Sequence, residues 1–191
     1  MKSGFKSELM ETEAGPKQVK KKKFHSPIDV EEVEIKKLGE KDVDEATRVM
    51  RKCMFTVSEE EIARIVEKGM SYGAFVDRIL VGVALSWGVR FNPQTREFEE
   101  GEENSLFLED DAILLAYEGR GIRELLIEKR EEEGQERGFS HVVAITSQFN
   151  PEEENVGKVI EQRGNKTEKV LQRRGYRFAK TKNGVVAYNS Y

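Results

Sequence analysis

The apolar and polar residues of this chain recur with two different periods, and each period predicts one kind of element. Residues 33–38 alternate as a strand does, whereas residues 41–55 and 59–69 carry apolar residues at the spacing of one helical face. The apolar face of the first helix consists of Val43, Ala46, Val49, Met50 and Cys53. Cys53 is therefore expected to pack in the core.

Helix-capping residues precede several helical segments. Asp42 and Glu45 have the spacing of a capping box at the start of the first helix, and Ser58 precedes the second. Asn165 and Glu168 repeat the capping-box spacing before the last helix. These residues predict where three of the helices begin.

The middle of the chain contains apolar strands separated by a polar loop. Residues 71–91 predict two strands joined by a tight turn at Asp77 and Arg78, and residues 105–117 predict a further strand. Between them, residues 92–104 include five glutamates. This loop forms either a solvated hairpin tip or a surface that collects a basic substrate.

The order of the predicted elements indicates an α/β (α+β) domain. Residues 139–149 are the most apolar strand, typical of a central position, and a short helix at 153–162, the capped helix and a hairpin turning at Asn183 and Gly184 follow. Neighbouring strands early and late favour antiparallel pairing, and the strand–helix–strand unit around Gly121 requires a parallel pair. We therefore expect a mixed, mostly antiparallel, twisted sheet of about seven strands with helices on both faces.

Composition narrows the range of functions. The formal net charge of −4 argues weakly against a dedicated nucleic-acid-binding protein. A single cysteine excludes an internal disulfide and a multi-cysteine zinc site, and only two histidines, His25 and His141, disfavour a histidine-based metal centre. No apolar run reaches the roughly 18 residues that cross a bilayer. The start of the chain has no apolar signal segment, so we expect a cytoplasmic protein.

Residues 1–31 differ from the rest of the chain. They are polar and include the basic segment KQVKKKK at Lys17–Lys23. They predict a flexible extension preceding a folded domain at residues 32–191. The alternative is a basic arm that binds RNA or an acidic partner.

A glycine-rich junction follows the strand predicted at residues 105–117. Gly119, Arg120 and Gly121 stand where the next helix begins. Free N–H groups and the positive end of a helix dipole favour anions there, glycines allow close approach to the backbone, and Arg120 adds a permanent charge. The junction predicts a pyrophosphate-binding loop, with a tightly packed turn as the alternative.

This junction and a later motif together resemble the GNAT N-acetyltransferase superfamily. The segment YEGRGIRELL at residues 117–126 is similar to its loop, Arg/Gln-x-x-Gly-x-Gly/Ala. The segment NKTEKVLQRRGYRF at residues 165–178 is similar to its last helix, which ends in Tyr-x-x-x-Gly-Phe. The resemblance covers residues 33–191. It implies the GNAT-like acyl-CoA N-acyltransferase fold, acetyl-CoA as the co-substrate and no metal.

The resemblance also implies which residues bind acetyl-CoA. In that family the loop amides bind the pyrophosphate, and the end of the preceding strand pairs with the pantetheine arm. A polar residue after the next strand often lies near that arm. The implied residues are Ile113, Leu114, Leu115, Gly119, Arg120, Gly121, Ile122, Arg123 and Asn150.

Three positions depart from the family pattern. Glu118 stands where Arg or Gln is usual, and Arg123, in place of a small residue, either obstructs the pyrophosphate or binds it. Leu171 replaces the tyrosine that protonates the leaving thiolate. Acetyl-CoA binding is expected to survive these changes better than fast catalysis. Tyr176, at the family's phenylalanine position, is expected to pack in the core.

The predicted activity is direct transfer of the acetyl group from acetyl-CoA to an amine, of a protein or a small molecule, within a ternary complex. The attacking amine needs a base. Glu109 and Asp111, at alternate positions, are expected to share one face of the strand, with Asp110 on the other. Either serves as the base if burial raises its pKa; a solvated carboxylate at the strand end is the alternative.

A second function from another class stays open, namely a non-catalytic GNAT-like module that senses CoA or binds a partner or RNA. Nucleic acid is expected only through the lysine-rich extension, and no membrane partner is expected. Trp87 and Phe91 line an acceptor pocket or pack in the core. Open edges of the terminal hairpin make a homodimer a further expectation.

Overall fold

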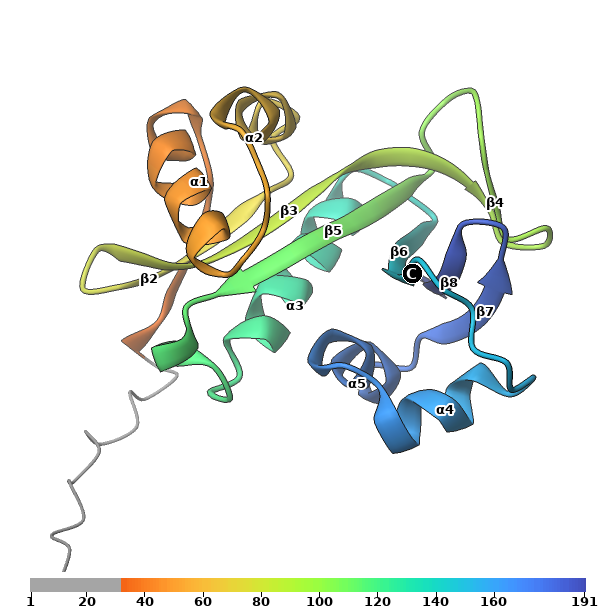
Figure 1. Ribbon diagram of the computed structural model, residues 1–191. Coiled ribbons are helices and arrows are strands. Elements are labelled where there is room, and N and C mark those ends of the chain that lie inside the picture. The colour runs from red at the N-terminus through yellow and green to blue at the C-terminus, as the bar shows by residue number, and fades with distance from the viewer. Residues whose placement is uncertain (1–31) are drawn as a thin grey trace, which may run out of the picture.

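A twisted eight-stranded sheet with helices on both faces forms the framework of the computed structural model (Figure 1). The structure describes residues 32–191, so the predictions for residues 1–31 lie outside the described residues. The strand order is β1-β2-β3-β5-β6-β8-β7, and β4 pairs with the C-terminal end of β3. β5 and β6 are parallel, whereas the other pairs are antiparallel. The expected mixed sheet is confirmed.

The elements follow the predicted order with one addition, since strand β4 lies within residues 92–104, where the sequence predicted a polar loop. The strands are β1 (Glu34–Lys37), β2 (Tyr72–Val76), β3 (Ile79–Asn92), β4 (Glu97–Glu99), β5 (Ser105–Ile113), β6 (His141–Ser147), β7 (Arg177–Thr181) and β8 (Gly184–Ser190). The helices are α1 (Val43–Lys52), α2 (Glu59–Val66), α3 (Ile122–Glu136), α4 (Val156–Arg163) and α5 (Lys166–Arg173). Two 3₁₀ turns are η2 (Glu40–Asp42) and η3 (Leu115–Tyr117). Within residues 32–191, no helix combines the length and the apolarity needed to cross a membrane.

Two helical layers bury the two faces of the sheet. Helices α1 and α2 cover one face, and α3 and α5 cover the other (Figure 1). The first layer buries, among others, Ala46, Met50, Ile62, Val83 and Leu85. The second buries, among others, Leu106, Leu108, Ile113, Leu126, Ile127 and Leu171. Cys53 packs at the margin of the first layer, and burial raises the pKa of its thiol, so its predicted packing role is confirmed.

Two predicted caps are confirmed. The Ser58 hydroxyl accepts a hydrogen bond from the Glu61 amide at 3.2 Å. Asn165 and Glu168 form a reciprocal capping box, each side chain accepting from the other's amide at 2.8 Å.

The capping box predicted at Asp42 and Glu45 is wrong. The Asp42 carboxylate accepts from the Gly39 amide at 2.9 Å and so stabilises η2, which precedes α1. Glu45 forms an ion pair with Arg48 instead. The Asp42 carboxylate had a second possible donor, the Gly39 amide on its N-terminal side. It accepts from that amide within the 3₁₀ turn and not from an amide of the first turn of α1.

Both predicted hairpin turns form, the last one displaced by a residue. Asp77 and Arg78 have φ angles of 50° and 68°, as a two-residue hairpin with right-handed twist requires. In the last hairpin Thr181 pairs with Gly184, so the two connecting residues are Lys182 and Asn183 rather than Asn183 and Gly184. Gly184 follows them with a φ of 102°.

Leu126 provides a test of the second layer. It is 0% exposed on α3, so Leu126→Ala leaves a cavity, and we expect the free energy of unfolding to fall by about 2–5 kcal/mol. Urea unfolding followed by circular dichroism measures the change. Ile79→Ala is the control, because Ile79 is 56% exposed and its truncation should change stability by less than about 0.5 kcal/mol.

Candidate active site

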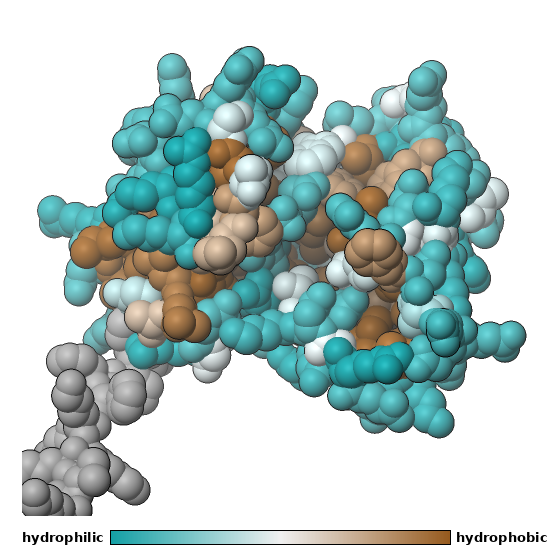
Figure 2. All heavy atoms as spheres, viewed as in Figure 1, coloured by the Kyte–Doolittle hydropathy of each residue, from teal (hydrophilic) through white to brown (hydrophobic). Residues whose placement is uncertain are grey.

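Strands β5 and β6 pair for a short distance and then separate. Their parallel ladder consists of the pairs Ser105–His141, Leu106–Val142 and Phe107–Val143. Beyond it, β5 continues along β3 and β6 continues along β8. The facing edges of residues 108–113 and 144–147 therefore do not pair with each other. The surface is hollowed between the two halves of the molecule (Figure 2).

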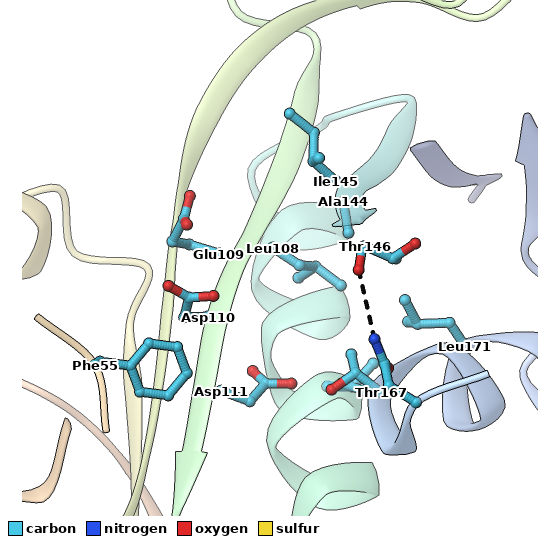
Figure 3. Close-up of a pocket in the computed structure, with 12 residues that line it drawn as sticks. Phe55, Leu108, Glu109, Asp110, Asp111, Ala144, Ile145, Thr146, Thr167 and Leu171 are labelled. Carbon is cyan, nitrogen blue, oxygen red and sulfur yellow. Dashed lines mark hydrogen bonds between the residues drawn. The ribbon is translucent and has the colours of Figure 1, made fainter. Parts of the chain in front are cut away.

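The separation creates a cavity of about 230 Å³, here called the interstrand cleft (Figure 3). Strands β5 and β6 supply two of its walls, and α5 supplies a third. It is lined by Phe55, Leu108, Glu109, Asp110, Asp111, Ile127, Ala144, Ile145, Thr146, Asn165, Thr167 and Leu171.

A β-bulge interrupts β5 inside this cleft. Across the β3–β5 ladder one residue, Leu85, lies opposite two residues of β5, Glu109 and Asp110. Because side chains alternate along a strand with a period of two, one extra residue moves every later side chain of β5 to the other face. Leu108 and Asp111 consequently both lie on the face that α3 covers.

The bulge separates the two carboxylates that the sequence placed on one face. The Asp111 side chain is 2% exposed and forms ion pairs with Arg130 and Arg123 of α3. Glu109 and Asp110 are instead close enough to Glu61 of α2 for its charge to raise the pKa of both carboxyl groups. The prediction that Glu109 and Asp111 share a face, with Asp110 opposite, is therefore wrong, because the alternation it assumed is broken at the bulge.

Glu109 titrates in an unusual environment. Burial raises the pKa of its carboxyl group to about 7, and the negative charge of Asp110 adds to the effect. Burial also raises the pKa of Asp110. Among the described residues neither carboxylate forms an ion pair, in contrast to Asp111. Glu109 is thus a carboxyl group that both accepts and releases protons near neutral pH.

The glycine junction adopts the geometry expected of an anion-binding loop. Gly119 and Gly121 have φ angles of 75° and 79°, and Gly121 is the residue before the first turn of α3. Within residues 32–191 no group accepts a hydrogen bond from the amides of residues 119–124. These amides and the positive end of the α3 dipole are available to an anion.

A second cavity, here called the loop pocket, lies between this junction and α5. Its volume is about 480 Å³. It is lined by Ile113, Tyr117, Glu118, Gly119, Gly121, Ile122, Arg123, Glu124, Lys166, Lys169, Val170 and Arg173. Neighbouring residues of β5 and α5 line the two cavities: Asp111 and Thr167 line the cleft, and Ile113 and Lys166 line the pocket. The Arg123 side chain lines the pocket and bonds to Asp111 and Thr167, so it lies between the two cavities.

Arg123 points inward and neutralises Glu118. Its guanidinium group, on a residue 9% exposed, donates to the Glu118 carboxylate at 2.9 Å and to the Thr167 hydroxyl at 3.2 Å. The Lys166 ammonium lies 3.4 Å from the other oxygen of Glu118. The two departures from the expected loop sequence therefore compensate each other, and the charge of Glu118 is balanced.

The remaining loop residues occupy different positions. Ile113 is the last residue of β5 and is buried. The Leu114 amide donates to the Val81 carbonyl at 2.9 Å, and Leu115, 86% exposed, begins η3. Of the three residues predicted at the strand end, only Ile113 lines the loop pocket.

Arg120 and Asn150 lie at the margins of the site. The Arg120 guanidinium lies over the Tyr117 ring at 5.8 Å, and its Nη1 is buried without a hydrogen-bond partner among the described residues. The Asn150 amide donates to the Thr181 carbonyl at 2.8 Å, and Asn150 lines neither cavity.

Helix α5 contributes residues that the sequence reasoning did not assign to a site. Asn165 and Thr167 line the cleft, and Lys166, Lys169 and Arg173 line the loop pocket. The spacing of the three basic residues, at three and four positions, places them on one helical face, which was the available signal. The sequence pattern of residues 165–175 predicts a capped helix and no ligand site.

Three aromatic residues belong to the core, and a fourth residue, Leu171, is buried where it lines the interstrand cleft. Leu171 is 0% exposed, and Tyr176 is buried with its hydroxyl donating to Glu131 at 2.7 Å. Trp87 and Phe91 belong to an aromatic cluster and line neither cavity. The core interpretation of Tyr176, Trp87 and Phe91 is thereby confirmed.

Solved structures share the fold of this chain. The loading GNATL domain of CurA from Lyngbya majuscula aligns with a TM-score of 0.65 at 18% identity, over 83% of this chain and 97% of that one. The GphF GNAT-like decarboxylase in complex with isobutyryl-CoA aligns with a TM-score of 0.62 at 14% identity, over 82% and 98%. The PaiA N-acetyltransferase from Thermoplasma acidophilum in complex with coenzyme A gives 0.57 at 15%, over 83% and 99%. No protein-family model and no curated protein sequence matches the chain.

The pKa of Glu109 is directly testable. In carbon-13 NMR titrations we expect its carboxyl group to titrate near pH 7, and Asp110→Asn to lower that value, because a neighbouring negative charge is removed. Asp44→Asn on α1 is the matched control and should leave the titration unchanged. A Glu109 pKa near 4.5 in the wild-type protein would contradict the environment described.

Proposed function

Since this chain has the GNAT fold, we propose that it binds an acyl-CoA and transfers the acyl group to an amine. The acyl-CoA that we propose is acetyl-CoA. The observation that carries the proposal is that two cavities lie near each other. One is bordered by strand edges that do not pair with each other, and the other by loop amides without a hydrogen-bond acceptor among the described residues. The first suits an extended arm with amide groups, and the second suits a diphosphate.

The loop pocket fits a pyrophosphate in charge and in space. The amides of residues 119–124 supply donors, and three basic residues of α5 line the pocket. Lys166 pairs with Glu118 and Arg173 pairs with Glu124, whereas Lys169 forms no ion pair among the described residues and supplies the unbalanced positive charge. No atom lies within 4 Å of the position that a Cβ would take at Gly119. The backbone there is open to a ligand.

The interstrand cleft fits the arm that would connect the diphosphate to the thioester. The inner edges of β5 and β6 carry backbone groups that do not pair across the cleft. Side chains of Leu108, Ala144 and Leu171 make part of its lining apolar, beside three carboxylates of β5 and the polar residues of β6 and α5. An extended ligand with its own amides can lie between the strands and hydrogen-bond to an edge.

Bound acyl-CoA supplies an activated thioester carbonyl. Glu109 is placed to accept the proton of an attacking amine, since it lines the cleft and its pKa is about 7. Asp111 holds two guanidinium groups, so of the two candidate carboxylates we assign the base to Glu109 and a structural role to Asp111.

Leu171 limits the expected rate of acyl transfer. A leucine donates no proton, so the leaving thiolate receives none from this position. Slow turnover is the expected consequence. The same substitution supports the alternative, a module that binds CoA without catalysis.

Two measurements separate the proposals. Isothermal calorimetry with acetyl-CoA and with CoA tests binding, and thiol release with a panel of amines (a peptide N-terminus, lysine, a polyamine) tests transfer. Binding with amine-dependent thiol release supports the enzyme. Binding without release supports the CoA-binding module, and absence of binding overturns both.

Lys169 tests the loop pocket. Lys169→Ala removes a positive charge from its lining, and we expect the Kd for acetyl-CoA to rise about tenfold, equivalent to about 1.4 kcal/mol. The loss should shrink as salt rises, because screening weakens the contact. Lys158→Ala on α4, outside both cavities, is the control and should bind as the wild type does.

Glu109 tests the chemistry. Glu109→Gln keeps the size of the side chain and removes the base, so we expect kcat to fall about 10²–10⁴-fold with little change in the Kd for acetyl-CoA. In the wild-type protein kcat/KM should rise with pH up to about 7, since the ionised carboxylate is the active form. An unchanged profile in Glu109→Gln would assign the base elsewhere.

A further inference from the structure

Arg130 of α3 is a fully buried cation without an assigned role in the proposed reaction. Its exposed fraction is 0%, although a buried charge is costly unless its donors are all satisfied. Its Nε donates to the Leu126 carbonyl of its own helix at 3.2 Å, and its Nη2 pairs with Asp111. The remaining donor, Nη1, bonds to backbone carbonyls of the sheet.

Nη1 of Arg130 bonds to the two strands at the site of the bulge. It donates to the carbonyl of Leu85 at 2.8 Å and to the carbonyl of Glu109 at 3.4 Å. Leu85 is the one residue of β3 that faces the two-residue bulge, and Glu109 is the first residue of the bulge. A bulge locally disrupts ladder hydrogen bonds, and buried carbonyls need a donor in their place.

Resting on the proposed function, we infer that Arg130 is a positioning residue: by donating to the carbonyls of Leu85 and Glu109, it fixes the bulge and so the direction from which the Glu109 carboxylate enters the cleft. Asp111 is the counter-ion that holds the guanidinium group in place. A single guanidinium group thus joins α3, β3 and β5 at the residue assigned as base.

Charge and positioning are separable contributions of Arg130. Its positive charge lowers the pKa of Glu109, against the raising effects of burial, Asp110 and Glu61. Lysine keeps the charge but lacks the planar fork that reaches several acceptors. Arg130→Lys therefore removes the positioning contribution and largely keeps the electrostatic one.

The variants are Arg130→Lys and the double variant Arg130→Met with Asp111→Leu. The double variant replaces the ion pair with apolar groups, a change that buried pairs often tolerate, so that the protein stays folded. Arg137→Met is the matched control. Its guanidinium group also bonds a carboxylate, Glu133, and a carbonyl, that of Gly69, but away from the bulge.

The kinetic readout is kcat against KM across pH. We expect both Arg130 variants to lose about 100-fold in kcat, the order expected for a displacement of about 1 Å. Arg130→Lys leaves the lining of both cavities intact and should keep the KM for acetyl-CoA unchanged. Arg130→Lys should also keep the wild-type pH midpoint, because it keeps the positive charge beside Glu109. Wild-type kcat in Arg130→Lys would overturn the inference.

A second readout does not depend on activity. Hydrogen exchange of the β3 and β5 amides beside the bulge should accelerate at least tenfold in both Arg130 variants and stay unchanged in Arg137→Met. If the wild-type protein shows no turnover, the proposed function fails while the exchange result still decides the role of Arg130 at the bulge. Unchanged exchange in both variants would refute that role.

Discussion

The short parallel ladder between β5 and β6 is the constraint on which the rest of the structure depends. Three residue pairs join a half-sheet of β1, β2, β3, β4 and β5 to a second half-sheet of β6, β8 and β7. Because pairing ends at Phe107 and Val143, the two strands leave an opening inside the sheet. Helices α3 and α5 line that opening, and their residues complete both cavities. The site is thus a consequence of where one ladder ends.

The charges around this opening are distributed unequally. Asp111 and Glu118 are balanced by arginines of α3, so the interior between the strand and the helix carries little net charge. The groups that form no ion pair among the described residues have opposite sign in the two cavities: the Glu109 and Asp110 carboxyl groups in the interstrand cleft, and the Lys169 ammonium group in the loop pocket. There Lys166 pairs with Glu118 and Arg173 with Glu124. This division matches the two ends of the proposed reaction, where one end binds phosphate and the other removes a proton.

The sequence predicted the fold well because each signal was local. Ser58, Asn165 and the two-residue turn at Asp77 and Arg78 act within a few residues, and the parallel pair followed from the strand–helix–strand order. The site was harder, because an extra residue in β5 leaves no trace in an alternating pattern until its partner strand is known. The same holds for Arg123, whose inward direction depends on Glu118 and Thr167 from other segments. Long-range partners, which spacing along one chain does not specify, account for both gaps.

The separated strands also bear on how the protein avoids self-association. Strand edges with free backbone groups are templates for pairing with other molecules, and natural proteins cover them or keep them short. The inner edges of β5 and β6 border a cavity of about 230 Å³ that α5 also lines, and the Asn165 side chain donates to the Thr146 carbonyl on one of them (Figure 3). The fold therefore places two strand edges that do not pair with each other beside a cavity in the middle of the sheet. An edge in that position is a smaller aggregation hazard than an exposed strand at the margin of a sheet.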